Sequence, residues 1–464
     1  MNTIRKKLED KKIVILGFGK EGLSTYKFIR AYQPELPLVI ADQNGKMTIE
    51  ELQSDVNLSF VLGDKYDENL NDFDLILKSP GVSLANIDYF IDRKKLTSQT
   101  SLFVEAYRDQ VIGITGTKGK STTASLIYHI LKEAGRDVKL AGNIGVPFFD
   151  IVDEITPETI IVAELSAHQL EFIDNSPHIA ILLNIFQEHL DHFTTFNDYQ
   201  LAKLNITNYQ KKEDYLIYNQ DDLYIGNLLR ANLFEHNTMP FRRNMMLDTG
   251  AYSYDSHVFL MENKEKIDDY ELGALHNLPG KHNYYNVMAA ILVARLQEVD
   301  HKHIVTGLNS FQNLEHRIEY VGIFNEIKFY NDSISTIPET TIAAVNTLRK
   351  VQTLILGGFD RGIDYQTLID FLAKSEVKNI AFTGPAGKRI FDEWQNSKEN
   401  FPENYLISDD YHKIVNFAFE KTSPYKICVL SPAAASYDQF ENFEARGRCF
   451  KDLVLKIGNN NNKS

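Results

Sequence analysis

The chain has 464 residues, of which 43% are hydrophobic, and its 63 acidic and 49 basic side chains give a formal net charge of −14. This length accommodates about three domains of ~150 residues each. The acidic excess argues against a nucleic-acid-binding surface, because such surfaces need clustered lysine and arginine. The longest apolar segments, such as 179–183, have the length of strands and are far shorter than the ~20 residues that span a bilayer.

The cellular compartment is indicated by the cysteines and the N-terminus. Cys428 and Cys449 are the two cysteines, they cannot form a disulfide framework, and neither has a metal-ligand spacing. Basic residues precede the apolar run 13–16, but this run is too short for a signal peptide and no small-residue cleavage site follows it. We therefore expect a cytoplasmic protein that binds neither membrane nor nucleic acid.

The first strand–turn–helix unit carries a G-x-G-x-x-G fingerprint at Gly17, Gly19 and Gly22. A second strand, predicted over 38–41, ends at Asp42, twenty residues after the last of these glycines. This arrangement is typical of dinucleotide sites, in which a helix N-terminus binds the pyrophosphate and the acidic side chain reaches a ribose. An NAD-dependent dehydrogenase is therefore one hypothesis.

A third strand, predicted over 73–78, runs into a Ser-Pro-Gly-Val turn that contains Ser79 and Gly81. The turn follows the carboxyl end of its strand, where open α/β sheets bind ligands. Ordinary turn chemistry explains the same two residues equally well.

Residues 113–122, Gly-Ile-Thr-Gly-Thr-Lys-Gly-Lys-Ser-Thr, are the most informative stretch of the chain. An apolar strand enters it and an amphipathic helix leaves it, so backbone N–H groups and a helix dipole would face a polyphosphate. Lys120 supplies a cation, and the hydroxyl of Ser121 or Thr122 is a candidate Mg²⁺ ligand. The stretch is shorter than the full G-x-x-x-x-G-K-[ST] pattern, because Ile114 occupies the position of the first glycine. A solvated turn is the alternative, and the flanking strand and helix favour a nucleotide triphosphate site.

Two strands of the same sheet end in candidate ligands. Glu164 follows the strand predicted over 159–163, and His189 follows that over 178–183, so both are expected at the sheet edge that carries the glycine-rich loop. A carboxylate there suits Mg²⁺. The histidine alone is a weak metal candidate, because no zinc-site spacing surrounds it. Lys203, on a predicted helix, would by itself be interpreted as a solvated residue.

Further along, a turn leads into a helix on which Asn283 and Asn286 lie one turn apart. Both amides could face one ligand, or the first could cap the helix. Residues 242–270 alternate polar and apolar side chains, which predicts a hairpin.

The alternation of strands and helices predicts an α/β protein with parallel sheets covered on both faces. We expect a Rossmann-like N-terminal domain, a central domain with a P-loop-type parallel sheet, and a Rossmann-like C-terminal domain that ends in a disordered, asparagine-rich tail. The expected bounds are 1–98, 99–313 and 314–464, with the tail at 458–464.

Taken together, these stretches resemble the Mur ligase family over nearly the whole chain. No single one would suffice, but their order and spacing are specific. The strongest pieces are 116–122, Glu164 to Gln169, His189 to Asp191 with Lys203, His282-Asn283, His316-Arg317, Asn331 to Ser333, and Ser431 to Gly447.

The resemblance implies an ATP-dependent ligase of peptidoglycan synthesis that joins D-glutamate to UDP-N-acetylmuramoyl-L-alanine. A carboxylate of the UDP-linked substrate would attack the γ-phosphate of ATP, and the amine of D-glutamate would then attack the acyl phosphate. The N-terminal domain would bind UDP, the central one ATP with two Mg²⁺, and the C-terminal one the amino acid. The resemblance also implies a monomer.

The resemblance assigns the catalytic and metal roles by position. Lys120 would hold the β and γ phosphates, and Ser121 and Glu164 would hold one Mg²⁺. His189 would hold a second Mg²⁺ together with Lys203, whose carbamylation turns a cation into an oxygen ligand. The other implied ATP contacts are Gly116, Thr117, Lys118, Gly119, Thr122, Asn283, Asn286, Arg317 and Asp332.

The substrate contacts implied by the resemblance fall into two groups. For the UDP-muramoyl substrate they are Gly17, Phe18, Gly19, Lys20, Asp42, Ser79, Gly81, Asn143, Ser166 and Gln169, and for D-glutamate they are Thr336, Arg361, Ser436, Tyr437 and Phe443. Two departures from the family pattern lie near the second group, because Ile334 and Arg361 stand where lysine is common. Arginine keeps the charge and adds bidentate geometry toward a carboxylate.

Three other functions fit parts of the chain. A dehydrogenase would use the N-terminal fingerprint but would leave the glycine-rich loop of the central domain without a task. Another ATP-dependent amide ligase, such as a folylpolyglutamate synthase, is disfavoured by the uridine-type N-terminal domain. A regulatory P-loop NTPase would hydrolyse the nucleotide without needing an acid and an amine as substrates.

Overall fold

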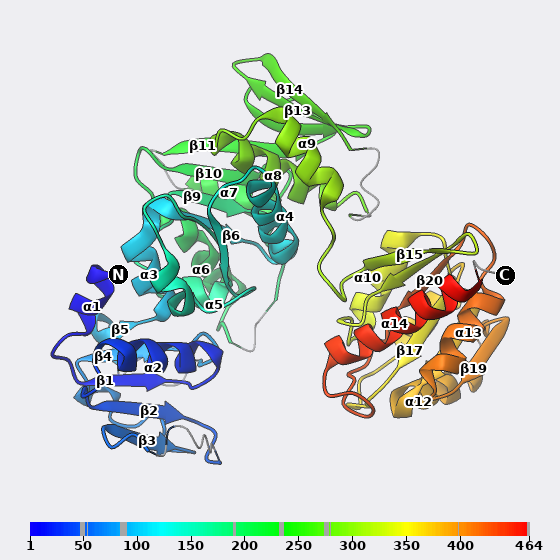
Figure 1. Cartoon of the computed structure of the whole chain (residues 1–464), viewed down its shortest axis with the longest axis horizontal. Coiled ribbons are helices and arrows are strands. Elements are labelled where there is room, and N and C mark those ends of the chain that lie inside the picture. The colour runs from blue at the N-terminus through cyan, green and yellow to red at the C-terminus, as the bar shows by residue number, and fades with distance from the viewer. Residues whose placement is uncertain are drawn as a thin grey trace. The chain divides into compact units, whose positions relative to one another are not determined.

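The computed structural model describes residues 1–46, 52, 54–83, 91–188, 192–231, 236–272, 278, 280–397 and 399–461. These residues form two compact units, one of Met1–Ala274 with His282–Ser310 and one of Leu275–Lys281 with Phe311–Ser464. The first unit holds two sheets and the second holds one (Figure 1). The prediction of an α/β protein built on mostly parallel sheets is confirmed.

The N-terminal sheet has five parallel strands in the order β3-β2-β1-β4-β5. Its central strand β1 is buried throughout, as expected for a parallel strand with both faces covered. The elements are α1 (Asn2–Leu8), β1 (Ile13–Leu16), α2 (Lys20–Tyr32), β2 (Leu38–Asp42), β3 (Leu58–Leu62), β4 (Leu75–Lys78), β5 (Leu96–Thr97) and α3 (Gln99–Tyr107).

The central sheet has nine strands in the order β14-β13-β12-β11-β10-β9-β6-β8-β7. The strands from β7 to β12 are parallel, and β12, β13 and β14 form the predicted antiparallel hairpins. The strands are β6 (Val111–Thr115), β7 (Val138–Gly142), β8 (Ile160–Glu164), β9 (Ile179–Leu182), β10 (Tyr215–Asn219), β11 (Asn237–Arg243), β12 (Gly250–Tyr254), β13 (His257–Glu262) and β14 (Glu265–Glu271). The helices are α4 (Lys120–Glu133), α5 (Ala167–Leu170), α6 (Phe196–Asn208), α7 (Leu223–Ala231), α8 (Asn283–Leu296) and α9 (His301–Ser310).

The first two sheets share one hydrophobic core. The ring of Phe28 on α2 lies 4.4 Å from that of Phe149, and Phe103 on α3 stacks on Phe148 at 4.6 Å. Aromatic contacts of this kind bury large apolar areas and fix the two layers against each other. The N-terminal and central segments therefore pack as one unit.

The sheet of the second unit has six strands in the order β15-β16-β20-β17-β18-β19, and all neighbours are parallel except β15 and β16. Hydrophobic clusters cover both of its faces. The strands are β15 (Glu319–Phe324), β16 (Ile327–Asn331), β17 (Val351–Gly357), β18 (Asn379–Thr383), β19 (Asn404–Ile407) and β20 (Ile427–Leu430). The helices are α10 (Pro338–Leu348), α11 (Gln366–Leu372), α12 (Gly384–Gln395), α13 (Tyr411–Lys421) and α14 (Phe443–Asn461).

The predicted disordered tail needs a correction. Helix α14 continues through residues 458–461, so the prediction is wrong for them, and residues 462–464 lie outside the described part. The cause is tertiary packing, because a Cβ at Gly458 would meet the ring of Phe324 at 2.3 Å and Ile457 packs on the same core. Such contact overrides the weak helix propensity of glycine and asparagine.

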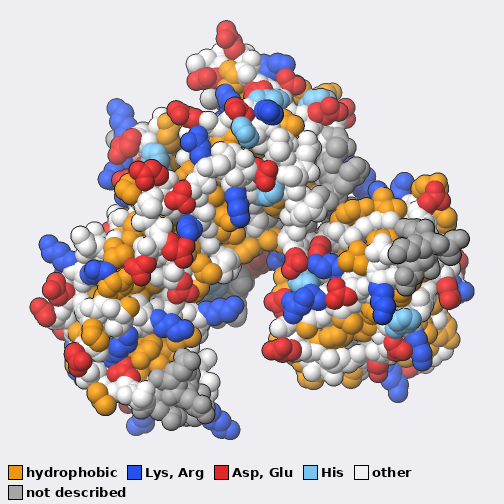
Figure 2. All heavy atoms as spheres, in the orientation of Figure 1, with side chains coloured by type: hydrophobic (Ala, Val, Ile, Leu, Met, Phe, Trp, Pro, Cys, Tyr) orange, Lys and Arg blue, Asp and Glu red, His pale blue; other side chains and the backbone are white. Residues whose placement is uncertain are grey.

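Two further observations bear on partners. None of the helices within the described ranges is long and apolar enough to cross a membrane. Acidic and basic side chains are intermingled over the face of the molecule seen in Figure 2.

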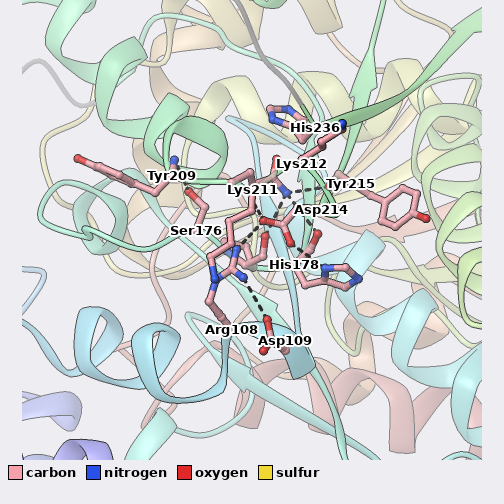
Figure 3. Close-up of polar contacts among 12 residues, drawn as sticks. Arg108, Asp109, Ser176, His178, Tyr209, Lys211, Lys212, Asp214, Tyr215 and His236 are labelled. Atoms are coloured by element: carbon pink, nitrogen blue, oxygen red, sulfur yellow. Dashed lines mark hydrogen bonds and ion pairs between the residues drawn. The ribbon is translucent and has the colours of Figure 1, made fainter.

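A buried ion pair fixes the amino ends of the central strands (Figure 3). The carboxylate of Asp214, just before β10, is fully buried between the guanidinium of Arg108 and the imidazole of His178, whose Nδ1 lies 2.8 Å from Oδ1. The N–H of Lys211 also donates to this carboxylate. The cluster joins residues before β6, β9 and β10, at the sheet edge opposite the glycine-rich loop, which indicates a structural role.

We expect Asp214→Asn to lower the free energy of unfolding by about 3 kcal/mol, because it removes the buried carboxylate that faces the Arg108 charge and leaves it only the exposed Asp109. Asp109→Asn is the matched control, since Asp109 pairs with the same guanidinium at 3.1 Å but is 83% exposed. Urea unfolding of both variants measures the effect. Equal losses of stability in the two variants would contradict this account.

Candidate functional site

The glycine-rich loop lies between β6 and α4, as predicted. Gly119 is the N-cap of α4 and has a φ of +86°, a conformation that favours glycine. A Cβ at this position would lie 2.5 Å from Oδ1 of Asn286 on α8. Thr123 Oγ1 donates a hydrogen bond to the same amide oxygen at 3.1 Å, and Asn286 Nδ2 donates to Asn283 Oδ1 at 2.8 Å. The loop and the two predicted asparagines therefore lie together.

Asn283 does not cap α8. The N-cap residue of this helix is His282, so the capping interpretation of Asn283 is wrong. The side chain instead accepts from Asn286 within the buried contact to the glycine-rich loop.

Asn184, after β9, is hydrogen-bonded to the glycine-rich loop through its side chain and its carbonyl. Its Oδ1 accepts from the N–H of Lys118 at 2.8 Å, and its Nδ2 donates to the carbonyl of Lys118 at 2.9 Å. Its own carbonyl accepts from the N–H of Thr117 at 2.9 Å. These bonds preorganise the loop before any ligand binds. The sequence did not single out Asn184, because the contact joins segments 66 residues apart.

Two lysines converge on one backbone carbonyl. The Nζ atoms of Lys120 and Lys203 each donate to the carbonyl of Gly116 at 2.9 Å. Lys203 is only 1% exposed, so its interpretation as a solvated helix residue is wrong. Burial, and next the charge of Lys120, hold the pKa of Lys203 well below its ordinary value. The neutral form of this amine is therefore favoured beside the glycine-rich loop.

Glu164, at the end of β8, is also buried. Its strand pairs with β6 so that Ile114 lies opposite Glu164, which places the carboxylate beside the loop. Oε1 accepts from Asn143 Nδ2 at 2.7 Å, whereas Oε2 has no hydrogen-bond partner among the described residues. A buried carboxylate oxygen without a partner is costly and fits a cation.

The rest of the predicted metal site is incomplete in the described part of the chain. His189 lies outside the described residues. Among those described, no three His, Cys, Asp or Glu side chains gather to hold a metal ion. This is compatible with Mg²⁺, which is commonly held by one or two carboxylates together with hydroxyl, water and phosphate oxygens.

The N-terminal glycine loop is held by the residues that the fingerprint predicts. Gly17 has a φ of +87°, and its carbonyl accepts from Ser79 Oγ at 2.6 Å. The N–H of Phe18 donates to Asp42 Oδ2 at 2.6 Å, and the N–H of Asn44 donates to Oδ1 at 2.8 Å. The Asp42 carboxylate thus holds the backbone of the loop in place by accepting these two hydrogen bonds.

A hydrogen bond between the start of α2 and α5 was not predicted. Gln169 Nε2 donates to Glu21 Oε1 at 2.6 Å, and Gln169 and Ser166 form a reciprocal capping box at the start of α5. Burial raises the pKa of Glu21 to about 7, with Gln169 and Lys78 opposing the shift. The G-x-G-x-x-G pattern assigns no role to the position of Glu21, so the sequence offered no signal for this contact.

In the second unit, the predicted amino-acid residues follow the carboxyl ends of the strands. Arg361 Nη2 donates to the carbonyl of Thr336 at 2.7 Å. Ser436 is buried, whereas Tyr437 is 69% exposed and its ring lies 6.4 Å from that of Phe359. These residues come from three different loops.

Arg446, which sequence reasoning missed, fixes these loops. It is 1% exposed, and its guanidinium donates to the carbonyl of Ser333 at 2.9 Å and to those of Ala434 and Ala435 at 3.0 Å. Ser333 Oγ in turn donates to the carbonyl of Phe443 at 2.8 Å. The buried arginine therefore positions the loops.

Asp332 is buried within its own unit. Oδ2 accepts from Ser431 Oγ at 2.7 Å and Oδ1 from the N–H of Ile318 at 3.1 Å, while burial raises the pKa of the carboxyl group to about 6. The ATP contacts assigned to Asp332 and Arg317 remain predictions. The union of the first unit's loops with those of the second unit in one site is likewise a prediction.

Two family models match the chain. The Mur ligase middle domain matches residues 114–294, and the MurD-like N-terminal domain of Mur ligases matches residues 11–92. The chain is similar to UDP-N-acetylmuramoylalanine--D-glutamate ligase of Thermoanaerobacter sp. (strain X514), with 34% identity over 97% of this chain and 99% of that protein. The enzyme of the same name from Clostridioides difficile (strain 630) is 33% identical over 97% and 99% of the two chains.

Solved structures share the fold at low identity. MurC from Thermotoga maritima superposes with a TM-score of 0.57 and 16% identity, over 96% of this chain and 100% of that one. MurF from the same organism, solved in complex with ADP, gives a TM-score of 0.56 and 17% identity over 97% of each chain. These likenesses show the fold, and the full-length relatives and the domain matches show the family: this chain belongs to the Mur ligases.

Proposed function

We propose that this chain joins D-glutamate to UDP-N-acetylmuramoyl-L-alanine in an ATP-dependent reaction that releases ADP and phosphate. The observation that carries the proposal is the full-length similarity to relatives that are named for this reaction. The preorganised glycine-rich loop with its converging lysines supplies the phosphate-binding feature that such a reaction needs.

The reaction transfers a phosphoryl group and then forms an amide. The carboxylate of the UDP-linked substrate attacks the γ-phosphorus of ATP, the bond to ADP breaks, and an acyl phosphate forms. The amine of D-glutamate attacks the acyl carbon, loses a proton and expels phosphate. Lys120, which folds onto the carbonyls of Gly116 and Thr117 in this structure, would turn to the β and γ phosphates when ATP binds.

The predicted Mg²⁺ ligands include Ser121 and Glu164, and the partnerless Oε2 of Glu164 supports the second of these. Bound Mg²⁺ would neutralise the charge of the phosphates. The proposal of a second Mg²⁺ adds His189 and a carbamylated Lys203. The lowered pKa of Lys203 supports carbamylation, because only a neutral amine reacts with carbon dioxide.

The N-terminal loop would bind the UDP pyrophosphate at the start of α2. Glu21 lies in the first turn of this helix, where an ionised carboxylate would repel the ligand. Its raised pKa keeps a large fraction of it neutral near pH 7, which removes much of that repulsion. Asn143 and Gln169 would meet the muramoyl part of the substrate.

The amino acid would bind in the second unit, where the guanidinium of Arg361 is held beside Thr336 and suits a carboxylate. The proposal assigns the three functions to residues 1–98, 99–313 and 314–464, which act in a monomer. A cytoplasmic location is part of the proposal, because ATP and UDP-linked precursors are supplied there.

An amino-acid panel tests the proposed function. With UDP-N-acetylmuramoyl-L-alanine and ATP present, ADP release should be at least tenfold faster with D-glutamate than with L-glutamate, D-aspartate or L-lysine. The physical reason is that Arg361 and the surrounding loops fix one carboxylate geometry. Release that is independent of either substrate, or equally fast with another amino acid, would contradict the proposal.

Lys203→Ala should lower the rate of amide formation by roughly 100-fold, because an oxygen ligand of the metal is lost. Added acetate should restore part of this activity. Lys120→Ala is the matched control, since it removes a neighbouring lysine whose role a carboxylate cannot replace. Full activity of Lys203→Ala, or equal rescue of both variants, would refute the carbamate.

Glu21→Gln should remove a pH dependence of stability. The folded pKa of about 7 lies above the ordinary value of 4.5, so the wild-type chain loses stability as pH rises through 7, and no difference is expected below 4.5. Thermal unfolding should therefore show equal midpoints at about pH 4.5 and a higher midpoint for the variant at about pH 8. Parallel curves for the two proteins would contradict the raised pKa.

A further inference from the structure

The sheet of the second unit carries a cavity near the amino ends of β16, β17 and β20. The cavity has a volume of about 600 Å³, within the usual range of small-molecule sites. Its lining comes from the β15–β16 hairpin, from the turn between α10 and β17, and from the residues that lead into β20. The loops that carry Thr336, Arg361 and Ser436 follow the carboxyl ends of these strands.

The floor of the cavity is apolar. Tyr330, Leu348 and Ile427 are largely buried and belong to the core between α10 and the sheet. Ile323, which pairs with Lys328 across the hairpin, adds an apolar side chain that is 51% exposed. A ligand that fills this space would cover apolar surface that water now contacts.

The rim is positively charged, in contrast to the acidic chain as a whole. Lys328, Arg349 and Lys350 line the cavity, and none of them forms an ion pair with another residue in the described ranges. Glu326 is the one acidic residue of the lining, and it accepts a hydrogen bond from the hydroxyl of Tyr425. The lining therefore carries an excess of cations that suits an anion.

A tyrosine hydroxyl adds a polar group to the apolar floor. Tyr330 lines the cavity with a largely buried ring, and its hydroxyl, which forms no hydrogen bond to a residue that the structure describes, is open to solvent. A ligand oxygen in the cavity can accept a hydrogen bond from this hydroxyl. The walls are also fixed in advance, because Ile427 N–H donates to the carbonyl of Lys350 at 3.1 Å and Tyr425 N–H to that of Glu326 at 2.8 Å.

We propose that this cavity is a second ligand site, for a small organic anion in which a phosphate or carboxylate group is attached to an apolar body. The anionic group contacts the three cations of the rim. The apolar body lies on the floor, where the Tyr330 hydroxyl can donate to an oxygen of the ligand. Such a ligand would bind without occupying the glycine-rich loops or the amino-acid loops.

Methyl NMR of the full chain labelled at isoleucine tests the site, because Ile323 and Ile427 report on the cavity. Phenyl phosphate and benzoate are the probes, and they separate a phosphate from a carboxylate ligand. Inorganic phosphate and benzyl alcohol carry the charge or the apolar body alone. We expect saturable shifts of both methyl groups with at least one of the two aromatic anions, and binding at least tenfold weaker with either partial probe.

The double variant Lys328→Gln/Lys350→Gln should bind the same probe roughly tenfold more weakly. Lys388→Gln/Lys413→Gln is the matched control, since it removes the same charge from α12 and α13 outside the cavity and should bind as the wild type does. Tyr330→Phe should weaken binding a few-fold while keeping the buried ring. The absence of saturable shifts with both aromatic anions, or equal weakening in the two double variants, would overturn the proposal.

Discussion

Two lysine amines share one backbone carbonyl in the glycine-rich loop of the first unit. Both Nζ atoms lie 2.9 Å from the oxygen of Gly116, and the amine of Lys203 is buried. Burial, and next the charge of the neighbouring Lys120, lower the pKa of Lys203. The two amines make the loop a favourable place for an anion, and the lowered pKa of Lys203 favours its neutral form.

Residues from neighbouring elements hold the glycine-rich loop in position around these two lysines. Asn184 and Asn286 both contact the loop, and the absence of a side chain at Gly119 allows Asn286 to approach. The parallel sheet brings Glu164 alongside, because β8 pairs with β6 in register. Because these hydrogen bonds already order the loop, ligand binding costs less conformational entropy.

Sequence alone predicted the elements with strong local signals. The strands at the centre of each sheet are continuous apolar runs, and the two glycine loops carry turn chemistry that only a few residue types satisfy. The Mur ligase family was predicted from the order of these motifs and is confirmed by full-length relatives. Short or partly exposed strands such as β3 and β19 were missed, because their patterns are too weak to separate from loops.

Other features could not be predicted because they depend on contacts between distant segments. Four sets of hydrogen bonds join positions far apart in the chain. They are those of Lys203 to Gly116, of Asn184 to Lys118, of Gln169 to Glu21, and the four that Arg446 makes to loop residues. Each of these residues is polar and would by default be assigned to the surface. Their partners become visible only when the sheets are assembled.

The most direct test of the central claim compares two glycines with similar backbone strain. Gly119 and Gly135 have φ values of +86° and +73°, but a Cβ at Gly119 would collide with Asn286, whereas one at Gly135 would meet nothing within 4 Å. Calorimetric titration with ATP and Mg²⁺ should show Gly119→Ala binding at least tenfold more weakly than the wild type and Gly135→Ala binding unchanged. Equal ATP affinities of the two variants would show that the loop at residues 116–122 does not hold the nucleotide.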